Sequence, residues 1–424
     1  MPAIRNARQK STGQASRQGS NIVTIAGKKI KTTEVFDTFW RFAAERKAID
    51  DRRRAGLPPP WTEDPILSSL RFCNTFRVCD RASQYLITNV IETGSQDPSE
   101  LTFRVILFNI FTNIKTWELL ENEIGELTWA AYDQSTYANV LRSAKDDGVS
   151  LYTGSYQKPA PKLGHKEAFM NHLEFLEVLM NNGLQKQLAK CKYMADAFDV
   201  IAAMPGMGDF NAYQLLLDLS YTSVINFSES DFVVAGLGAR SGIEKCFSST
   251  LPLAGMLPQI IRWMFETQNE HFQRLGLTIS GLGPENLPLQ LCDIEHTLCE
   301  VDKYARIAHP KARGSGRPKT VAGRQYQPPV TEQPMTLHLP LAWSHPSRKI
   351  VRIKPGKHDK VTKRYVVDKI MDHRNDGGKR EYRVRWAGYS AKDDTWEPAS
   401  MFGKDAPLHI EEYHAALRKK GRTV

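Results

Sequence analysis

Two glycine-rich turns in the middle of the chain have the residue types and spacing that suit contact with a phosphate. The first reads MPGMGDFNA and contains Gly206 and Gly208, and the second reads AGLGARSGI and contains Gly236 and Gly238. Glycine allows a tight turn, and the backbone N–H groups of the helix that follows can then approach a DNA phosphate. The spacing predicts helix-hairpin-helix turns that bind duplex DNA. The alternative is that such a turn is an ordinary end of a helix.

A second chemical feature is a group of aromatic residues near the C-terminus. Apolar residues alternate from residue 366, a DGG turn follows at residues 376–378, and Tyr382, Val384 and Trp386 alternate on the returning segment. This pattern predicts a curled antiparallel sheet, which a helix at residues 406–417 would close. Aromatic faces are suited to a methylated ammonium, because this diffuse cation has lost hydrogen-bond donors and is attracted by ring quadrupoles.

The C-terminal segment resembles the chromodomain family through its WAGY and DTWEP motifs. The resemblance implies a small α+β module, a three-stranded antiparallel sheet with a C-terminal helix, that reads methyl-lysine on a histone H3 tail. It places the methyl-lysine cage on Tyr365, Trp386 and Tyr389, with Asp393 as the acid beside the cage. Trp396 is then the expected structural tryptophan. The alternative is a related fold in which the tryptophan belongs to the core and no ligand binds.

The elements that position these features fall into four segments. Apolar residues recur at helical spacing through residues 34–307, and strand alternation is nowhere sustained before residue 350, so we expect an all-α body there. Residues 1–33 are polar and basic, which predicts a disordered tail. Residues 308–360 are rich in proline and basic residues without an apolar period, which predicts a linker. Residues 361–417 are the expected chromodomain.

The net charge of +10 is carried by the tail and the linker. Residues 1–33 hold seven Lys and Arg and no acid, and residues 306–364 hold fourteen against two, whereas residues 34–305 hold 24 against 35. Basic segments beside an acidic body predict nonspecific attraction to duplex DNA; the alternative is that they only keep the chain soluble. Arg317 lies in a Gly-Arg-Pro sequence that resembles an AT-hook core, whose arginine can enter a narrow minor groove.

Several classes of protein are disfavoured by the sequence. No run of about 18 apolar residues and no signal-peptide core occur, so neither a membrane span nor secretion is expected. Six cysteines form no C-x-x-C pair and have no histidine at finger spacing, so we expect neither a disulfide framework nor a zinc ribbon. The sequence indicates no metal and no cofactor. The motif G-x-x-x-x-G-K-[ST] is absent, so phosphorylation by a P-loop kinase is not expected.

The helical body resembles one family, the helical domain of the 5-hydroxymethyluracil DNA kinases and the alpha-glutamyl/putrescinyl thymine pyrophosphorylases. That fold is glycosylase-like, and it implies recognition or modification of thymine-type (5-hydroxymethyl) bases in DNA. The similar segments are FRVCDR (76–81), NIKTW (113–117), GMGDFNAYQ (206–214), DLSY (218–221), GLGAR (236–240) and DIEHTLCEVDKY (293–304).

The resemblance implies charged groups that face a flipped base. If a pyrophosphate leaves the 5-methylene carbon of that base, cations must stabilise the developing charge, and four are candidates: Arg77, Arg81, Lys115 and Arg240. Asp231 precedes the second glycine turn at a spacing similar to that of the catalytic aspartate of hairpin-class glycosylases. Asp231 is followed by FVV where those enzymes have THV, and this difference argues against an excision activity.

The last helix of the body supplies further candidates. Glu295 and Asp302 lie at the margin of its buried stripe, where they can reach a pocket. Three other polar residues are expected on its solvated face: Asp293, His296 and Glu300. Asp80 and Lys303, from the matching segments, complete the candidate catalytic set.

The N-terminal tail reads ARQKSTGQASR from residue 7, which is similar to the Ala-Arg-Lys-Ser-Thr-Gly region of histone H3 with one glutamine inserted. An inserted residue moves the following side chains to the wrong pockets of a strand-binding groove, which argues against recognition of Lys10 by the chain's own chromodomain.

The predicted function is a nuclear, chromatin-associated protein that binds a methylated histone H3 tail and duplex DNA. Its helical body would recognise or modify a thymine-type base, as a pyrophosphorylase-like transferase if it is an enzyme. Two alternatives stay open: a noncatalytic heterochromatin adaptor, and a base-excision glycosylase-like protein.

Overall fold

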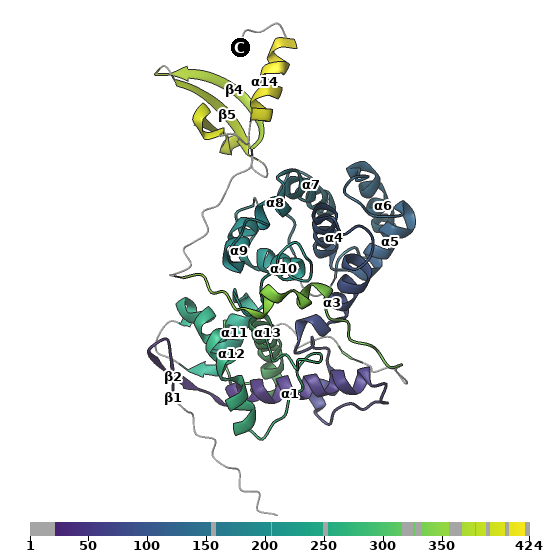
Figure 1. Ribbon diagram of the computed structural model, residues 1–424, viewed down its shortest axis with the longest axis vertical. Helices are drawn as coiled ribbons and strands as arrows, with labels where there is room; N and C mark the ends of the chain where they lie inside the picture. The colour runs from purple at the N-terminus through teal and green to yellow at the C-terminus, as the bar shows by residue number, and fades with distance from the viewer. Residues whose placement is uncertain are drawn as a thin grey trace, which may run out of the picture.

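The computed structural model describes residues 22–153, 158–204, 206–248, 253–315, 325–326, 333–355, 367–377, 379–386, 391–402 and 407–419. Within them the chain forms a helical body and, towards the C-terminus, an antiparallel sheet with one helix (Figure 1). The predicted fold class is confirmed. Four residues discussed above lie outside the described residues: Lys10, Arg317, Tyr365 and Tyr389.

The first part of the helical body, in chain order, contains α4, whose residues from Leu101 to Phe111 are all buried. Its elements are α1 (Glu34–Arg54), α2 (Pro65–Ser69), the 3-10 turn η1 (Arg77–Cys79), α3 (Arg81–Tyr85), the π-helical turn η2 (Leu86–Ile91), α4 (Pro98–Phe111), α5 (Ile114–Ile124) and α6 (Gln134–Asp146). Polar caps begin the two long helices: the Thr33 side chain accepts a hydrogen bond from the second residue of α1, and Asp97 caps α4.

The second part of the helical body, in chain order, ends with α13, which packs against α1, α11 and α12 (Figure 1). Its elements are α7 (Ala168–Asn181), α8 (Leu184–Leu188), α9 (Met194–Ala202), α10 (Asp209–Leu219), α11 (Leu237–Cys246), η3 (Leu253–Met256), α12 (Leu257–Arg274) and α13 (Leu291–Ala308). Gly242 allows α11 to pack closely against α13, because a Cβ at this position would lie 2.2 Å from the carbonyl oxygen of Leu298. Over the described residues, no helix has both the length and the apolarity that a membrane span requires.

The solvated face predicted for α13 is wrong. Asp293, His296 and Glu300 are 3%, 6% and 2% exposed, as deeply buried as the apolar stripe of the same helix. The reason is that α13 contacts α2 and η1 in addition to the three long helices, so little of its circumference meets solvent. A helix in this position must satisfy its polar side chains with partners from the protein.

A small sheet covers one end of the body and was not expected. Strands β1 (Ile22–Ile25) and β2 (Lys28–Thr32) form a hairpin, and β2 pairs with β3 (Phe247–Ser248). Ile25 and Ile30 are each 1% exposed, so the hairpin contributes to the core. The prediction of a disordered tail up to residue 33 is therefore wrong for residues 22–32, because two buried isoleucines in a short strand pair are too few to produce a recognisable period.

Residues 333–355, which the sequence places in the linker, pack against the helical body. We call this segment the strap; it contains the 3-10 turns η4 (Leu341–Ser344) and η5 (Pro346–Lys349). Met335 N–H donates to the Arg54 carbonyl at 2.9 Å, and the Arg348 side chain is 8% exposed. The linker prediction is wrong for these residues. Polar contacts and single buried side chains hold the strap against the body, and such contacts produce no apolar period in the sequence.

The C-terminal sheet has the strand order β4-β5-β6. Its elements are β4 (Val367–Asp376), β5 (Lys379–Trp386), η6 (Ala391–Asp393), β6 (Thr395–Pro398), η7 (Ala399–Phe402) and α14 (Pro407–Lys419). Both strand pairs are antiparallel, and β4 carries two register shifts where it bends. A small core lies beneath α14 and is formed by Ile370, Tyr382, Val384, Trp386 and Phe402. This is the curled sheet and closing helix that the sequence predicts.

Candidate functional site

A small cavity in the helical body brings together residues from four segments of the chain. It lies between η1 and α3 on one side and α10 on the other, with the end of α4 and Lys158 completing the wall. We call it the Arg77 cavity. Its volume of about 30 Å³ is enough for about one or two water molecules. It is lined by Arg77, Asp80, Ala82, Ser83, Leu86, Phe108, Thr112, Lys158, Gln214 and Asp218.

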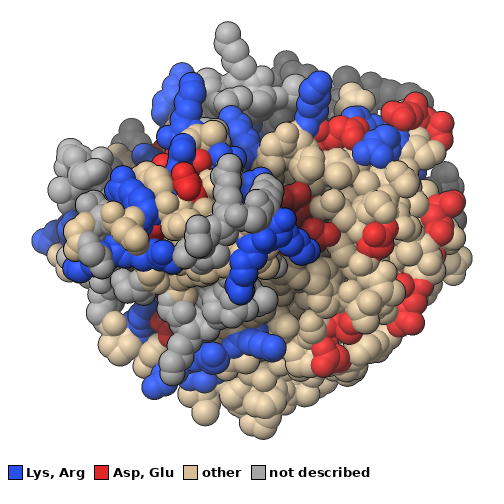
Figure 2. All heavy atoms as spheres, turned by 90° about the horizontal axis from the view of Figure 1, so that it is seen from above, with Lys and Arg blue, Asp and Glu red and all other residues tan. Residues whose placement is uncertain are grey.

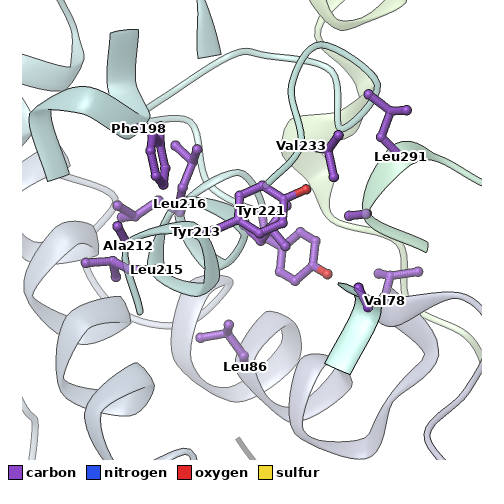
Figure 3. Close-up of a cluster of buried hydrophobic side chains, with 14 of the residues drawn as sticks. Val78, Leu86, Phe198, Ala212, Tyr213, Leu215, Leu216, Tyr221, Val233 and Leu291 are labelled. Atoms are coloured by element: carbon purple, nitrogen blue, oxygen red, sulfur yellow. The ribbon is translucent and has the colours of Figure 1, made fainter. Parts of the chain in front are cut away.

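A buried ion pair forms one side of the Arg77 cavity. The Arg77 Nη2 atom lies 2.7 Å from Asp218 Oδ1, and both side chains are 8% exposed. Arg77 also donates to the Tyr221 hydroxyl at 2.9 Å, and the amide of Asn109 donates to Asp218 Oδ2 at 2.5 Å. Figure 3 shows Tyr221 beside Tyr213 within the surrounding cluster of apolar side chains. A charge pair in such surroundings is held in one geometry, because removal of either partner would leave the other charge uncompensated.

Lys158 supplies a second cation to the cavity. Its ammonium donates to the carbonyl oxygen of Asn109 and, at 2.9 Å, to the Thr112 hydroxyl. The residue as a whole is half-buried, but its ammonium lies in the interior, and this burial lowers the pKa of Lys158 to about 8 despite the nearby Asp218 carboxylate. A lysine of this kind can exchange a proton near neutral pH.

Three polar residues of α13 hold the segment 73–80, which carries Arg77. The Asp293 carboxylate accepts the backbone N–H of Arg77 at 2.8 Å, and the Glu300 carboxylate accepts that of Cys73 at 3.1 Å. His296 pairs with the carboxylate of Asp80, with Nε2 and Oδ2 3.4 Å apart. The residues that were expected in solvent therefore position the cavity wall.

The ionisation of Asp80 and His296 follows from their contact. Burial alone would raise the pKa of Asp80, but the hydrogen bond and charge of His296 hold it below its usual value. Burial alone would lower the pKa of His296, yet the side chains of Asp80 and Cys73 hold it above its usual value. The two groups therefore form an imidazolium–carboxylate pair. Burial, with Glu300 and Asp80 nearby, raises the pKa of the Cys73 thiol.

Asp231, the proposed catalytic aspartate, is closed off from the Arg77 cavity. It is 3% exposed, its Oδ1 atom accepts the Arg352 N–H of the strap at 2.8 Å, and Oδ2 accepts the Ser228 N–H at 3.2 Å. Burial raises the pKa of Asp231. The structure thus gives this carboxylate the role of anchoring the strap.

The two glycine turns differ from each other. Gly206 has a φ of +73°, which favours glycine, and Gly208 precedes α10 with open space around its Cα. In the second turn the Gly236 N–H donates to Glu295 Oε1 at 2.9 Å, so that donor is occupied within the protein. A Cβ at Gly238 would lie 2.3 Å from the Cys299 sulfur. Packing onto α13 therefore explains the second turn, and Glu295 holds that turn in place. In the first turn Gly206 packs against Pro161, where a Cβ would lie 2.4 Å from the proline Cβ, and open space remains at Gly208.

The remaining charged candidates lie outside the Arg77 cavity. Asp302 accepts from Ser241 at 2.6 Å and pairs with Lys245 at 2.9 Å, so it joins α13 to α11. Other candidates pair along their own helices, Arg240 with Glu244 at 3.0 Å and Lys303 with Glu300 at 2.5 Å. The side chains of Arg81 and Lys115 are exposed. Of the candidate catalytic set, the structure brings together Arg77 and Asp80 at the cavity.

In the C-terminal module, Trp386 is 6% exposed and its indole N–H donates to the Thr395 hydroxyl at 2.9 Å. Trp396, the expected structural tryptophan, is less buried, and the Arg374 guanidinium lies 4.4 Å from its ring centroid. Asp393 is exposed on η6. The remaining two cage residues lie outside the described part of the chain, so the cage geometry stays a prediction.

Sequence reasoning missed Lys158, Asn109 and the roles of Gln214 and Asp218. A partial signal existed, because Gln214 and Asp218 lie in segments that resemble the related family. These two residues are four apart, so they share one face of α10. Lys158 lies in a segment without helical or strand periodicity, and its position next to Asp218 is a purely tertiary contact.

Comparison with known proteins gives matches to both parts of the chain. The family model described as "5-hmdU DNA kinase, helical domain" matches residues 33–314, and the Chromo (chromatin organisation modifier) domain matches residues 365–416. The 5-hmdU DNA kinase of Bacillus phage SP10 is 22% identical over 292 residues, which are 64% of this chain and 45% of that protein. The chain thus spans less than half the length of this relative. No solved structure gives a significant match.

The chromodomain has closer relatives. M-phase phosphoprotein 8 of Homo sapiens is 56% identical over 59 residues, which are 13% of this chain and 6% of that protein. Chromodomain Y-like protein 2 of Mus musculus is 46% identical over 50 residues, which are 12% of this chain and 9% of that protein. The chain belongs to the family of the 5-hmdU DNA kinase helical domain, and it carries a chromodomain at its C-terminal end.

Proposed function

We propose that this chain is a nuclear, chromatin-associated protein that reads a methylated histone H3 tail through its chromodomain and recognises or modifies a thymine-type base in DNA through its helical body. The observation that carries the second part is the Arg77 cavity, where Arg77, Asp218 and Lys158 converge from three separate segments. The match of residues 365–416 to the chromodomain family supports the first part.

The chemistry of the cavity suits a pyrimidine. Two cations, Arg77 and Lys158, and two acids, Asp80 and Asp218, line it, and His296 pairs with Asp80. A mixed set of donors and acceptors suits a neutral, hydrogen-bonding ligand. A thymine-type base offers an N–H donor and two carbonyl acceptors, which carboxylate acceptors and cationic donors can match. A cavity of about 30 Å³ is too small for a base, so base binding requires its wall to open.

Access to DNA is supported by the charge distribution. On the face seen in Figure 2, basic side chains gather over one part and acidic side chains are spread over the rest. Together with the basic segments of the sequence, this favours electrostatic attraction of DNA to one part of the molecule. Binding should therefore weaken as salt concentration rises.

Base recognition is tested with the full chain and labelled duplexes that contain either 5-hydroxymethyluracil or thymine at one position. Lys158→Gln should reduce the preference for the modified duplex about tenfold, the value of one charged hydrogen bond. Lys162→Gln is the matched control, since Lys162 is an exposed lysine four residues away. Equal preference in wild type for the two duplexes would exclude base recognition.

Histone reading is tested with H3 tail peptides that carry or lack methyl groups on lysine. Tyr389→Ala should remove the difference in affinity between the two peptides. The control is Lys369→Gln, since Lys369 lies exposed on β4, outside the expected cage. If wild type binds methylated and unmethylated peptides equally, the chromodomain does not read methyl-lysine.

A noncatalytic adaptor is the second candidate, and one observation favours it. Asp231, Glu295 and Asp302 all have protein partners and serve the fold, so three of the expected catalytic acids are not presented to a ligand. Mass spectrometry of DNA nucleosides after incubation with the protein separates the two candidates. An enzyme changes the nucleoside composition and Lys158→Gln abolishes the change, whereas an adaptor leaves the composition unaltered. The appearance of abasic sites would instead indicate a glycosylase.

A further inference from the structure

Cys73, Asp80 and His296 place three potential metal ligands around one point. A sulfur, a carboxylate oxygen and a ring nitrogen from these residues all lie within 4.8 Å of one another. Cys73 and Asp80 flank η1, and His296 comes from the middle of α13. Among the described residues, no second group of His, Cys, Asp or Glu side chains approaches in this way. Thiolate, imidazole and carboxylate together are the ligands that zinc and similar divalent ions select.

We propose that Cys73, Asp80 and His296 bind a divalent transition-metal ion of the zinc class, with a fourth position left for water. The one measured edge of the group fits this geometry. With metal–nitrogen and metal–oxygen bonds of about 2.0–2.2 Å and tetrahedral angles, two such ligands lie about 3.3–3.5 Å apart. The distance from His296 Nε2 to Asp80 Oδ2 is 3.4 Å, which lies within this range.

The ligands are already oriented by neighbouring groups. The second oxygen of Asp80, Oδ1, accepts the Asn74 N–H at 2.7 Å, which turns Oδ2 towards His296. The Cys73 backbone N–H is held by Glu300, which lies one turn after His296 on the same helix. Hydrogen bonds of this kind, outside the ligand set, reduce the reorganisation that an incoming ion must impose.

The ion would join both ends of segment 73–80 to α13. That segment carries Arg77, whose guanidinium forms one side of the Arg77 cavity, and Asp80 lines the same cavity. The proposed role of the metal is therefore to position Arg77 relative to Asp218. This inference goes beyond the proposed function and does not depend on it, because it concerns the metal content of the protein whatever the protein binds.

The first test is a titration of the full-length, metal-free protein with Co²⁺, followed by visible and near-ultraviolet absorption. The wild type should bind one equivalent and develop a thiolate-to-cobalt charge-transfer band, which Zn²⁺ displaces. Cys73→Ser should lose this band, and His296→Gln should weaken Co²⁺ binding at least tenfold. The matched control is Cys191→Ser, since Cys191 is a partly buried cysteine in another part of the body and should leave the band unchanged. A wild type without the band, or a Cys73→Ser variant that keeps it, overturns the proposal.

A second test needs no variant and so covers the case in which the substitutions prevent folding. The wild-type protein is treated with iodoacetamide with and without Zn²⁺, and the modified cysteines are located by mass spectrometry. Zn²⁺ should slow the alkylation of Cys73 at least tenfold and leave that of Cys191 unchanged. Equal rates at Cys73 under both conditions would refute the site. Since neither readout involves DNA or histone peptides, failure of the metal site is distinguishable from failure of the proposed function.

Discussion

The strap makes a quantitative test of the structure possible at Arg348. Its guanidinium donates to three backbone carbonyl oxygens, those of Phe227 at 3.2 Å, Thr222 at 3.0 Å and Ile225 at 2.7 Å. The side chain is 8% exposed, and burial lowers the pKa of Arg348 to about 10. Arg348→Ala removes all three hydrogen bonds together. The three carbonyl groups must then be hydrated, and the strap loses its buried side-chain contact with the body.

The magnitude follows from the contacts. A hydrogen bond that involves a charged group contributes a net of about 1.5 kcal/mol or more, and three would give about 4–5 kcal/mol. The desolvation that lowers the pKa of Arg348 offsets part of this gain, and water can reach the carbonyl groups once the strap has moved, so we expect a loss of about 3 kcal/mol. Such a loss increases the fraction of protein with an open strap about a hundredfold.

Hydrogen exchange followed by mass spectrometry measures this opening directly. Peptides that cover residues 333–355 should exchange about a hundredfold faster in Arg348→Ala, including the Arg352 N–H that Asp231 accepts, while α4 and α13 keep their protection. Lys349→Ala is the control, because Lys349 forms an exposed ion pair worth little. If both variants exchange alike, or if Arg348→Ala exchanges at the wild-type rate, the reasoning is refuted.

Three further predictions concern the helical body. Arg77→Met should lower its free energy of unfolding by about 3–5 kcal/mol because it leaves the Asp218 carboxylate unpaired, and Arg77→Met with Asp218→Leu should restore much of this in denaturant titrations. Gly242→Ala should be strongly destabilising because its Cβ meets a backbone carbonyl at 2.2 Å, whereas Gly255→Ala, with nothing within 4 Å, should shift Tm little. Burial lowers the pKa of His172 to about 4, so between pH 6.5 and 4 the unfolded chain binds a proton that the folded chain does not bind. The free energy of unfolding therefore decreases by up to about 3 kcal/mol as the pH is lowered from 6.5 to 4. His172→Gln should flatten this part of the pH dependence of Tm; an unchanged slope would contradict it.

Much of the architecture was predictable because it has a local signature. The helical stripes of the body, the alternation around Tyr382 and Val384, and the turn before β5 are all carried by neighbouring residues. The resemblance of separated motifs in the correct order then identified both families, and the matches over residues 33–314 and 365–416 confirm them. Periodicity reports which residues face inwards, and for these elements it was sufficient.

The site was less predictable because its contacts join distant segments. Lys158 and Asp218 meet at the cavity although they are 60 residues apart, and Cys73 and His296 are separated by more than two hundred residues. A search for closely spaced cysteine and histidine ligands cannot find such a group. Amphipathic analysis failed for α13 for a related reason: it assumes that one face of a helix meets solvent, and α13 has neighbours on nearly all sides.

The strap also limits the length of chain that connects the helical body to the chromodomain. It ends at residue 355 and β4 begins at Val367, so the intervening chain spans at most about 40 Å when fully extended. Before the strap, the Tyr326 N–H donates to the Ser69 carbonyl of the body at 2.8 Å, so without the strap the chain from Tyr326 to Val367 could extend to about 140 Å. A shorter tether raises the effective concentration of one module near a site that the other already occupies. Arg348→Ala should therefore weaken binding to a nucleosome that offers both a methylated tail and DNA, while binding to the isolated tail peptide stays at the wild-type level. Equal weakening for peptide and nucleosome would show that the strap acts on the chromodomain itself and not through tether length.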